Sequence, residues 1–504
     1  MRLIRMAILA SLTAGMLEAQ QAPTVLDQYQ KALTLIDAAV AAHGGIEALR
    51  GARKARARVE GWDYHPTQSR RIAPPFDSTV RNSEVMIDLD RNYIVFNGTR
   101  GWPGGFLYGN RFVTRGDTTY IMSTRSQTYS IVTAAPASQQ FGNLFYIPSW
   151  YLLAAAESNS PGAGRYLGRM RLPSGAEVEA IAFTTPPSGN LVIGIDPSSR
   201  RLRAVMSVGT DVFTGDTEVT TEFLDWQMLG GMLLPARTIQ RRGGQVTNAS
   251  RFVAAEASYT VPDSLLRPPA NFTLNAPNPQ PQPVTELASG VWLVGSGSKS
   301  LVVAFDDHLV VIDAPAGTSA EVIRRAADIA PGKPIRYVVP THHHDDHFVG
   351  VRYHAANGAT IVTTPGSIDY LRRVMTAPMS SLMQASNQVA PRQDYRVETM
   401  AAGRRVFSDG SRTVEIHEIA SPHADAMLVA WLPAEGILFH ADLIESPALG
   451  TAQRGANAEA TTHLANVIRD KSWNVRTFAG AHATLRSPAE FQTLVRLPIL
   501  AHGQ

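Results

Sequence analysis

The stretch Thr341-His342-His343-His344-Asp345-Asp346-His347 indicates what kind of domain the second half of this 504-residue chain forms. Four of its side chains have the spacing His-x-His-x-Asp-His: His342, His344, Asp346 and His347. The apolar, β-branched residues 335–340 just before it predict a buried strand. These side chains are therefore expected on a tight loop at a strand end, where a rigid sheet orients them. Imidazole and carboxylate are ligands for divalent metals, zinc first.

Three residues further along the chain have the same ligand chemistry. Each lies at the end of a strand-like run or on a loop beside one: His423, Asp442 and His482. Strand ends of this kind can converge on one edge of a pair of packed sheets. The run of strands, then helices, then strands after residue 285 predicts two packed sheets with helices outside.

This set resembles the metallo-β-lactamase-fold hydrolase superfamily, in which the His-x-His-x-Asp-His motif is followed by a lone His, an Asp and a last His. The resemblance covers about residues 285–490. It implies an αββα sandwich and two divalent metal ions. The first ion would be held by His342, His344 and His423. The second would be held by Asp346, His347 and His482, and Asp442 would bridge the two.

The resemblance also implies the chemistry. Two dications lower the pKa of a shared water towards about 7, so a metal-bridging hydroxide would attack an ester, lactone, thioester or related bond of a small-molecule substrate. Asp346 is the candidate catalytic residue, because its second oxygen could orient that hydroxide. Zinc is expected, with iron and manganese as alternatives, since the chain has no cysteine. Asp313 is a candidate partner for a ligand imidazole.

Two alternatives stay open. Class B β-lactamases typically have Cys or Ser where Asp442 stands, so Asp442 looks more like glyoxalase II, lactonases and phosphodiesterases of this fold. A β-lactamase is therefore the less favoured enzyme. The second alternative is an exported ligand-binding or carrier protein with a non-catalytic metal domain.

The superfamily often has Gly where this chain has Ala441, and glycines where it has Ala481 and Ala483 beside His482.

The start of the chain indicates export. Arg2 and Arg5 precede an apolar run at residues 7–17, which is typical of a secretory signal peptide at residues 1–19. The run is too short for a stable membrane span. We therefore expect a bacterial protein of the periplasm or the medium. The chain has a net charge of +3, and its five lysines do not lie in a basic cluster. This distribution of charge argues against nucleic-acid binding.

The rest of the sequence predicts two domains. Seven prolines between residues 262 and 283 indicate a linker at 263–284, between a domain at 20–262 and the metallo-β-lactamase-fold domain at 285–504. The first domain begins with an amphipathic helix, and its predicted apolar face comprises Leu26, Tyr29, Leu33, Ile36 and Val40. Gly44-Gly45 would end that helix, and Gly230-Gly231 would form a hairpin turn. The remainder reads as mainly antiparallel β structure, so the whole chain is predicted to be α+β. The first domain is similar to lipoprotein-carrier-like half-barrels. This resemblance implies that it would bind an apolar ligand on its concave face.

Overall fold

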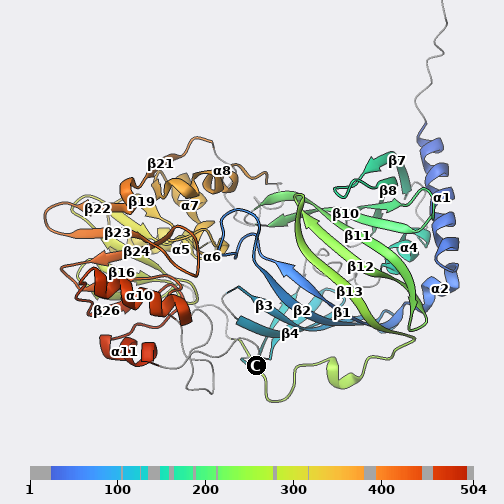
Figure 1. Cartoon of the computed structure of the whole chain (residues 1–504), viewed down its shortest axis with the longest axis horizontal. Helices are drawn as coiled ribbons and strands as arrows, with labels where there is room; N and C mark the ends of the chain where they lie inside the picture. The colour runs from blue at the N-terminus through green and yellow to red at the C-terminus, as the bar shows by residue number, and fades with distance from the viewer. Residues whose placement is uncertain are drawn as a thin grey trace, which may run out of the picture.

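The computed structural model describes residues 24–103, 106–124, 126–133, 148–157, 164–185, 189–211, 214–275, 281–315, 317–379, 393–444 and 458–496. The signal peptide predicted at residues 1–19 lies outside these ranges. The described residues form three sheets with helices packed on them, so the predicted mixture of sheet with a few helices is confirmed (Figure 1). Among the described helices, none has the length and apolar character that crossing a bilayer requires.

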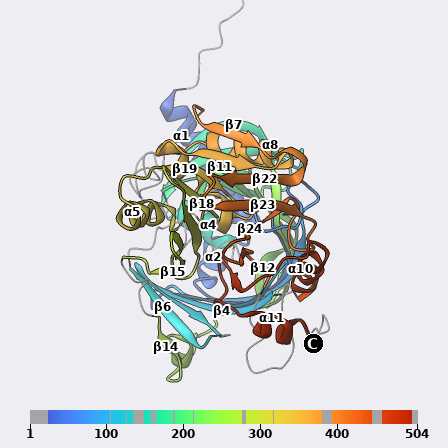
Figure 2. The ribbon, with the colours of Figure 1, turned by 90° about the vertical axis from the view of Figure 1, so that its left-hand side faces the viewer.

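One curved sheet of 14 strands dominates the first half (Figures 1 and 2). Its strands in chain order are β1 (Lys54–Tyr64), β2 (Ser78–Asp88), β3 (Tyr93–Trp102), β4 (Phe106–Arg115), β5 (Thr118–Ser123), β6 (Thr128–Thr133), β7 (Gly164–Arg171), β8 (Glu177–Thr185), β9 (Gly189–Ile195), β10 (Leu202–Asp211), β11 (Gly215–Leu229), β12 (Met232–Arg242), β13 (Gln245–Ala257) and β14 (Thr273–Leu274). The spatial order is β14-β6-β5-β4-β3-β2-β1-β13-β12-β11-β10-β9-β8-β7. Only the β14–β6 pair is parallel among these described strands.

Helices α1 (Val25–Ala42), α2 (Ile46–Gly51) and α4 (Ser149–Ala156) pack against this sheet and share one apolar core with it. The buried face of α1 comprises Ala32, Leu35, Ile36 and Ala39. The predicted face was therefore wrong in part, because Leu26 and Leu33 are 60% and 40% exposed. The small alanines let the helix approach β7 closely, which a pattern of large apolar residues does not reveal.

Both predicted glycine turns are confirmed. Gly44 follows α1 with φ +94°, a left-handed conformation that suits glycine at a helix end. Gly230 and Gly231 join β11 to β12 with φ +55° and +82°. A side chain at Gly230 would meet the Ala255 carbonyl oxygen at 1.7 Å, so only glycine fits there.

The segment predicted as a linker is partly packed onto the first sheet. It contains the short 3-10 helix η2 (Asp263–Leu265) and strand β14. Leu266 is buried in a cluster with Val95 and Val113 on the sheet. This part of the segment is thus not extended throughout, because Leu265 and Leu266 pack on apolar side chains of the sheet. The domain division itself stays a prediction.

The second half contains two further sheets. The larger has the order β15-β16-β17-β18-β19-β20-β21 and the smaller β22-β23-β24-β25-β26. Their bounds are β15 (Val284–Ala288), β16 (Val291–Val294), β17 (Ser300–Ala304), β18 (Leu309–Ile312), β19 (Ile335–Val339), β20 (Thr360–Thr363), β21 (Arg396–Thr399), β22 (Arg404–Ser408), β23 (Thr413–Ile419), β24 (Met427–Leu432), β25 (Ile437–Phe439) and β26 (Thr477–Ala479). Strands β18 to β21 run parallel, so their carboxyl ends lie at one edge.

Successive side chains along the strands of the larger sheet point to opposite faces, so they pack in two different cores. Val310 of β18 joins a core that also contains residues of the smaller sheet, whereas its neighbour Val311 joins a cluster with helix residues. The helices and 3-10 turns of this half are α5 (Ser319–Ile329), α6 (Asp345–Phe348), α7 (Val351–Ala356), η3 (Pro365–Ser367), α8 (Ile368–Thr376), η4 (Ala401–Gly403), α10 (Ala458–Asp470) and α11 (Pro488–Arg496). Packing on both faces explains why these strands are continuously apolar.

The buried His43 at the end of α1 gives a test of the first-half core. Its Nε2 accepts a hydrogen bond from the Leu202 amide at 3.1 Å. Burial, with Arg201 nearby, lowers the pKa of His43 from 6.5 to about 4. Because the unfolded state takes up a proton first, the stability that depends on neutral His43 is complete above pH 6.5 and falls as the pH drops towards 4.

We predict that His43→Gln unfolds less steeply with acid than the wild type. Between pH 7.5 and pH 4.5, the free energy of unfolding of the wild type should fall by roughly 1–3 kcal/mol more than that of the variant. Urea unfolding at both pH values measures it. An unchanged difference at the two pH values would show that His43 is not held neutral by its surroundings.

Candidate metal centre

The His-rich loop is buried at the carboxyl end of β19, as its sequence predicts. His342, His343, His344 and His347 are each no more than 2% exposed. His344 is the residue before α6, and Asp345 and Asp346 form the first turn of that helix. The neighbouring strand β18 ends beside the loop at Asp313, whose φ of +76° turns the chain at this edge. A solvated His-rich loop is therefore excluded.

The structure brings the seven predicted ligand residues together in two groups. The first group comprises His342, His344, His423 and Asp442, and the second comprises Asp346, His347, Asp442 and His482. Within each group the ligand-type atoms all lie within 4.8 Å of one another. Asp442 belongs to both groups, in the bridging position that the resemblance implies.

Short distances link the groups through Asp442. Its Oδ2 lies 3.3 Å from His423 Nε2 and 3.0 Å from His347 Nε2. Its Oδ1 lies 3.6 Å from His482 Nε2. Asp442 follows Ala441, which is fully buried with φ +47°. A left-handed alanine costs about 1 kcal/mol, which explains why glycine is common there in the resembling superfamily.

The second nitrogen of three imidazoles is held by a hydrogen-bond acceptor. His347 Nδ1 lies 2.6 Å from Asp313 Oδ2, so Asp313 contacts a ligand imidazole as predicted. His482 Nδ1 lies 3.1 Å from the Gly297 carbonyl oxygen. His344 Nε2 lies 3.1 Å from the Ser69 carbonyl oxygen, and its buried Nδ1 has no hydrogen-bond partner. Such contacts fix which nitrogen of each ring keeps its lone pair.

These atoms fit divalent cations. His423 Nε2 faces His342 Nε2 at 3.3 Å, and His482 Nε2 faces His347 Nε2 at 3.0 Å. Two nitrogens bound to one tetrahedral zinc ion would lie about 3.3 Å apart. Lone pairs that meet in a buried site repel one another unless a cation or proton lies between them. The donor set of five imidazoles and two carboxylates is therefore suited to two ions.

Burial and charge act differently on the rings. Burial lowers the pKa of His342 and His344 well below the ordinary value, which keeps them neutral as ligands must be. Burial alone would also lower the pKa of His347, but Asp313, Asp442 and Asp346 outweigh it and raise that pKa. The second group is more open, since the side chains of His482 and Asp346 are 37% and 42% exposed. A substrate could reach the site from this side.

A loop of the first half, residues 65–77 between β1 and β2, completes the surroundings of the site. The carbonyl oxygen of Ser69 lies 2.8 Å from His343 Nε2 and, as described, also accepts from His344. Gln68 Nε2 donates to Asp346 Oδ1 at 2.8 Å. An amide from the first half thus orients one carboxylate oxygen of Asp346, the candidate catalytic residue.

This loop is held in shape by its own contacts. Ser69 Oγ donates to Asp77 Oδ2 at 3.1 Å and accepts from the Asp77 amide at 2.9 Å. Thr67 Oγ1 donates to Asp345 Oδ2 at 3.2 Å. The sequence analysis missed these residues, because no local motif marks a serine, threonine or glutamine that meets its partner more than 270 positions away.

Among the histidines of the second half that lie in neither group are His417 and His440. His417 bonds Glu415 at 2.8 Å and packs on Trp473. His440 is completely buried, and a side chain at Gly480 would meet its ring at 2.5 Å. Both therefore serve packing.

Comparison with known proteins agrees with this geometry. Residues 293–477 match the family model described as the metallo-beta-lactamase superfamily. The matched segment lies in the C-terminal half, which therefore has the metallo-beta-lactamase fold that the sequence predicts. A search of curated proteins finds no match.

Solved metallo-beta-lactamases are among the similar structures. One from Pontibacter korlensis is 20% identical, with a TM-score of 0.33, and the match covers 43% of this chain and 98% of that one. The DIM-1 and TMB-1 metallo-beta-lactamases are each 17% identical, with TM-scores of 0.32; each match covers 43% of this chain and 96% of the other.

We predict that Gln68→Ala weakens metal binding by the metallo-beta-lactamase domain. Loss of the amide frees Asp346 to rotate, and changes behind a ligand typically cost about 10–100-fold in metal affinity. Competition with a chromophoric zinc chelator measures the dissociation constants. Gln227→Ala on the exposed part of β11 is the matched control and should bind as the wild type does. Equal affinities for both variants would contradict a positioning role for Gln68.

Proposed function

We propose that this protein is an exported metal-dependent hydrolase that cleaves an ester, lactone, thioester or related bond of a small molecule. The observation that carries the proposal is the convergence of seven ligand-type side chains from four separate segments into two groups that share Asp442. The matching superfamily supports metal-dependent hydrolysis as the class of reaction. We also infer that residues 285–504 form the αββα sandwich of that superfamily.

Two divalent ions, zinc first, would be held by the two groups. When bound, they would supply Lewis acidity and lower the pKa of a shared water towards about 7. The protein's own part is to keep the buried His342 and His344 neutral, to surround His347 with carboxylates and to keep those carboxylates fixed. The Ser69 carbonyl sets the tautomer of His344, and Asp313 sets that of His347.

Asp346 is the residue we assign to proton handling. Its Oδ2 faces His482 at 3.2 Å, within the second group. Its Oδ1 accepts from Gln68 and, like any carboxylate oxygen, has a second lone pair for a proton or a water. The partial exposure of Asp346 places this oxygen where a substrate can approach. Geometry thus supports a base held at one side of the metal pair.

The shared carboxylate favours a hydrolase other than a β-lactamase. Asp442 lies within 3.7 Å of imidazole nitrogens in both groups. A carboxylate has two oxygens and can therefore serve two ions, which a single thiol or hydroxyl does less readily.

We predict that His344→Ala abolishes hydrolysis while the fold stays intact. A panel of aryl esters, thioesters and lactones should be turned over by zinc-loaded wild type and not after chelation. Replacing a residue that hydrogen-bonds to a metal ligand typically costs roughly 10–100-fold in activity. Loss of a ligand itself should lower the rate of hydrolysis by more than that.

His417→Ala, which alters a buried imidazole outside both groups, is the control and should keep full activity. Circular dichroism checks folding of each variant. A fully metal-loaded wild type that turns over no member of the panel would support a carrier protein instead. Full activity in His344→Ala would remove that residue from the site.

A further inference from the structure

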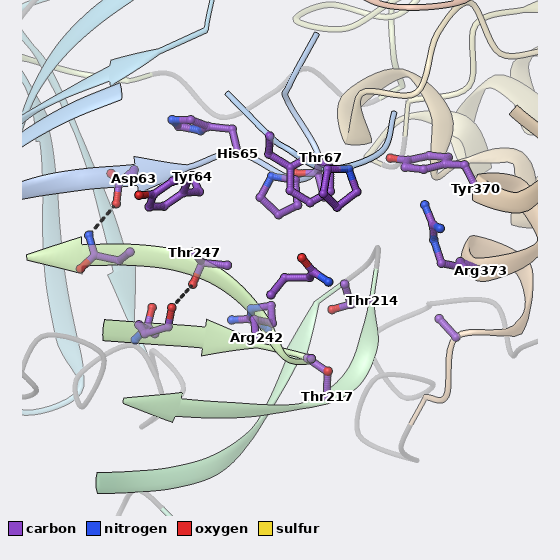
Figure 3. Close-up of a pocket in the computed structure, with 18 of the residues that line it drawn as sticks. Asp63, Tyr64, His65, Thr67, Thr214, Thr217, Arg242, Thr247, Tyr370 and Arg373 are labelled. Carbon is purple, nitrogen blue, oxygen red and sulfur yellow. Dashed lines mark hydrogen bonds between the residues drawn. The ribbon is translucent and has the colours of Figure 1, made fainter. Parts of the chain in front are cut away.

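A cavity of about 750 Å³ lies between the first sheet and α8, apart from the two metal-ligand groups. One wall comes from the ends of first-half strands, and the other from α8 and the residues after it (Figure 3). Tyr370, Arg373 and Thr376 line it at three-residue spacing, which places them on one face of α8. None of the seven ligand residues is among its lining residues.

The lining is strongly cationic. It contains four arginines, Arg81, Arg100, Arg242 and Arg373, and one acidic residue, Asp63. Burial lowers the pKa of His65, which also lines the cavity, to about 4, so this ring adds no charge near neutral pH. The cavity therefore has an excess of positive charge.

The single carboxylate is already engaged by two of these arginines. Asp63 lies 3.0 Å from Arg81 Nη1 and 3.0 Å from Arg100 Nε, and it accepts from Asn248 at 2.9 Å. Arg81 and Arg100 are direct partners across β2 and β3. Like charges in this position repel each other, and the carboxylate of Asp63 between them offsets part of that repulsion.

The other two arginines face the cavity from opposite walls. Arg242 ends β12, and Arg373 lies on α8 with its guanidinium 5.6 Å from the Tyr370 ring centre. Among the lining residues that the structure describes, one is acidic, Asp63, and it lies with Arg81 and Arg100. Guanidinium groups from two walls suit a planar or tetrahedral anion.

The uncharged part of the lining indicates more than a free inorganic ion. Phe76, Trp102 and Tyr370 contribute aromatic surface, and Thr217 and Thr247 contribute hydroxyl groups. A volume of about 750 Å³ is within the range of small-molecule sites. An occupant with an anionic group and an uncharged, partly apolar body matches this lining.

We propose that this cavity binds a small organic anion, a carboxylate or phosphate on an uncharged body, at a site separate from the metal centre. The site is adjacent to the metal centre through two of its lining residues. Thr67 bonds Asp345, and the Tyr370 hydroxyl donates to the His343 carbonyl oxygen. The bound anion would thus rest against the residues that support the metal ligands.

The test is calorimetric titration of zinc-loaded protein with benzene-1,3-dicarboxylate, with the neutral benzene-1,3-dicarboxamide as the matched probe. We expect the dicarboxylate to bind and the diamide not to bind. Arg242→Gln and Arg373→Gln should each weaken binding about tenfold or more, because each removes a charged hydrogen-bond donor. Arg237→Gln, on the same strand as Arg242 but paired with Asp225 at the surface, should bind as the wild type does.

Three results would overturn the proposal. The first is the absence of dicarboxylate binding to the wild type. The second is equal binding of the diamide. The third is binding that persists in both arginine variants and disappears in His344→Ala, which would place the probe on the metals. Zinc content and the thermal midpoint of each variant confirm folding, and Arg373 lies exposed on α8, where its replacement disturbs no core.

Discussion

The architecture of the site depends on one constraint: buried imidazoles must stay neutral while their lone pairs point at one another. Such an arrangement is unfavourable unless cations separate the rings. The structure meets the constraint by giving the second nitrogen of three rings an acceptor, from Asp313, Gly297 and Ser69. Around His347 the effect is the opposite, because two carboxylates of the ligand set and buried Asp313 raise its pKa and favour positive charge, from a proton or a cation, at that place. We interpret the whole edge of the second half as a support for two divalent ions.

The first half takes part in this support. Its 65–77 loop provides a carbonyl to His343 and His344 and an amide to Asp346. The same loop contributes Thr67 to the arginine-lined cavity on its other side. The antiparallel sheet thus has a role beyond covering the site, since it holds one candidate ligand and one candidate base in orientation. In our proposal, a small organic anion and the metal centre share this loop as a common wall.

The sequence predicted the second half closely because its signals are local. The apolar residues at 335–340, predicted as a buried strand, contain β19. Strand ends then place the candidate ligand residues close together, as the motif and its spacing predicted. The division into two groups came from the resemblance, and the candidate partner Asp313 contacts His347. Metal binding itself stays a prediction, as does the division into domains.

The predictions were wrong where contacts between distant parts of the chain determine which side chains are buried. The inner face of α1 uses Ala32 and Ala39, whose small size matters only against β7. The prolines between residues 262 and 283 predicted an extended connector, yet Leu266 is buried against the first sheet. The contacts of Gln68 and Ser69 with the His-rich loop could not be predicted from the sequence, because they depend on how the two halves of the chain pack together.

The most direct test of the central claim is anomalous diffraction from crystals of the zinc-loaded protein, measured above and below the zinc absorption edge. Our account predicts two peaks per chain: one among His342, His344, His423 and Asp442, and one among Asp346, His347, Asp442 and His482. A map with no peak between these side chains, or with zinc bound only elsewhere, would contradict it.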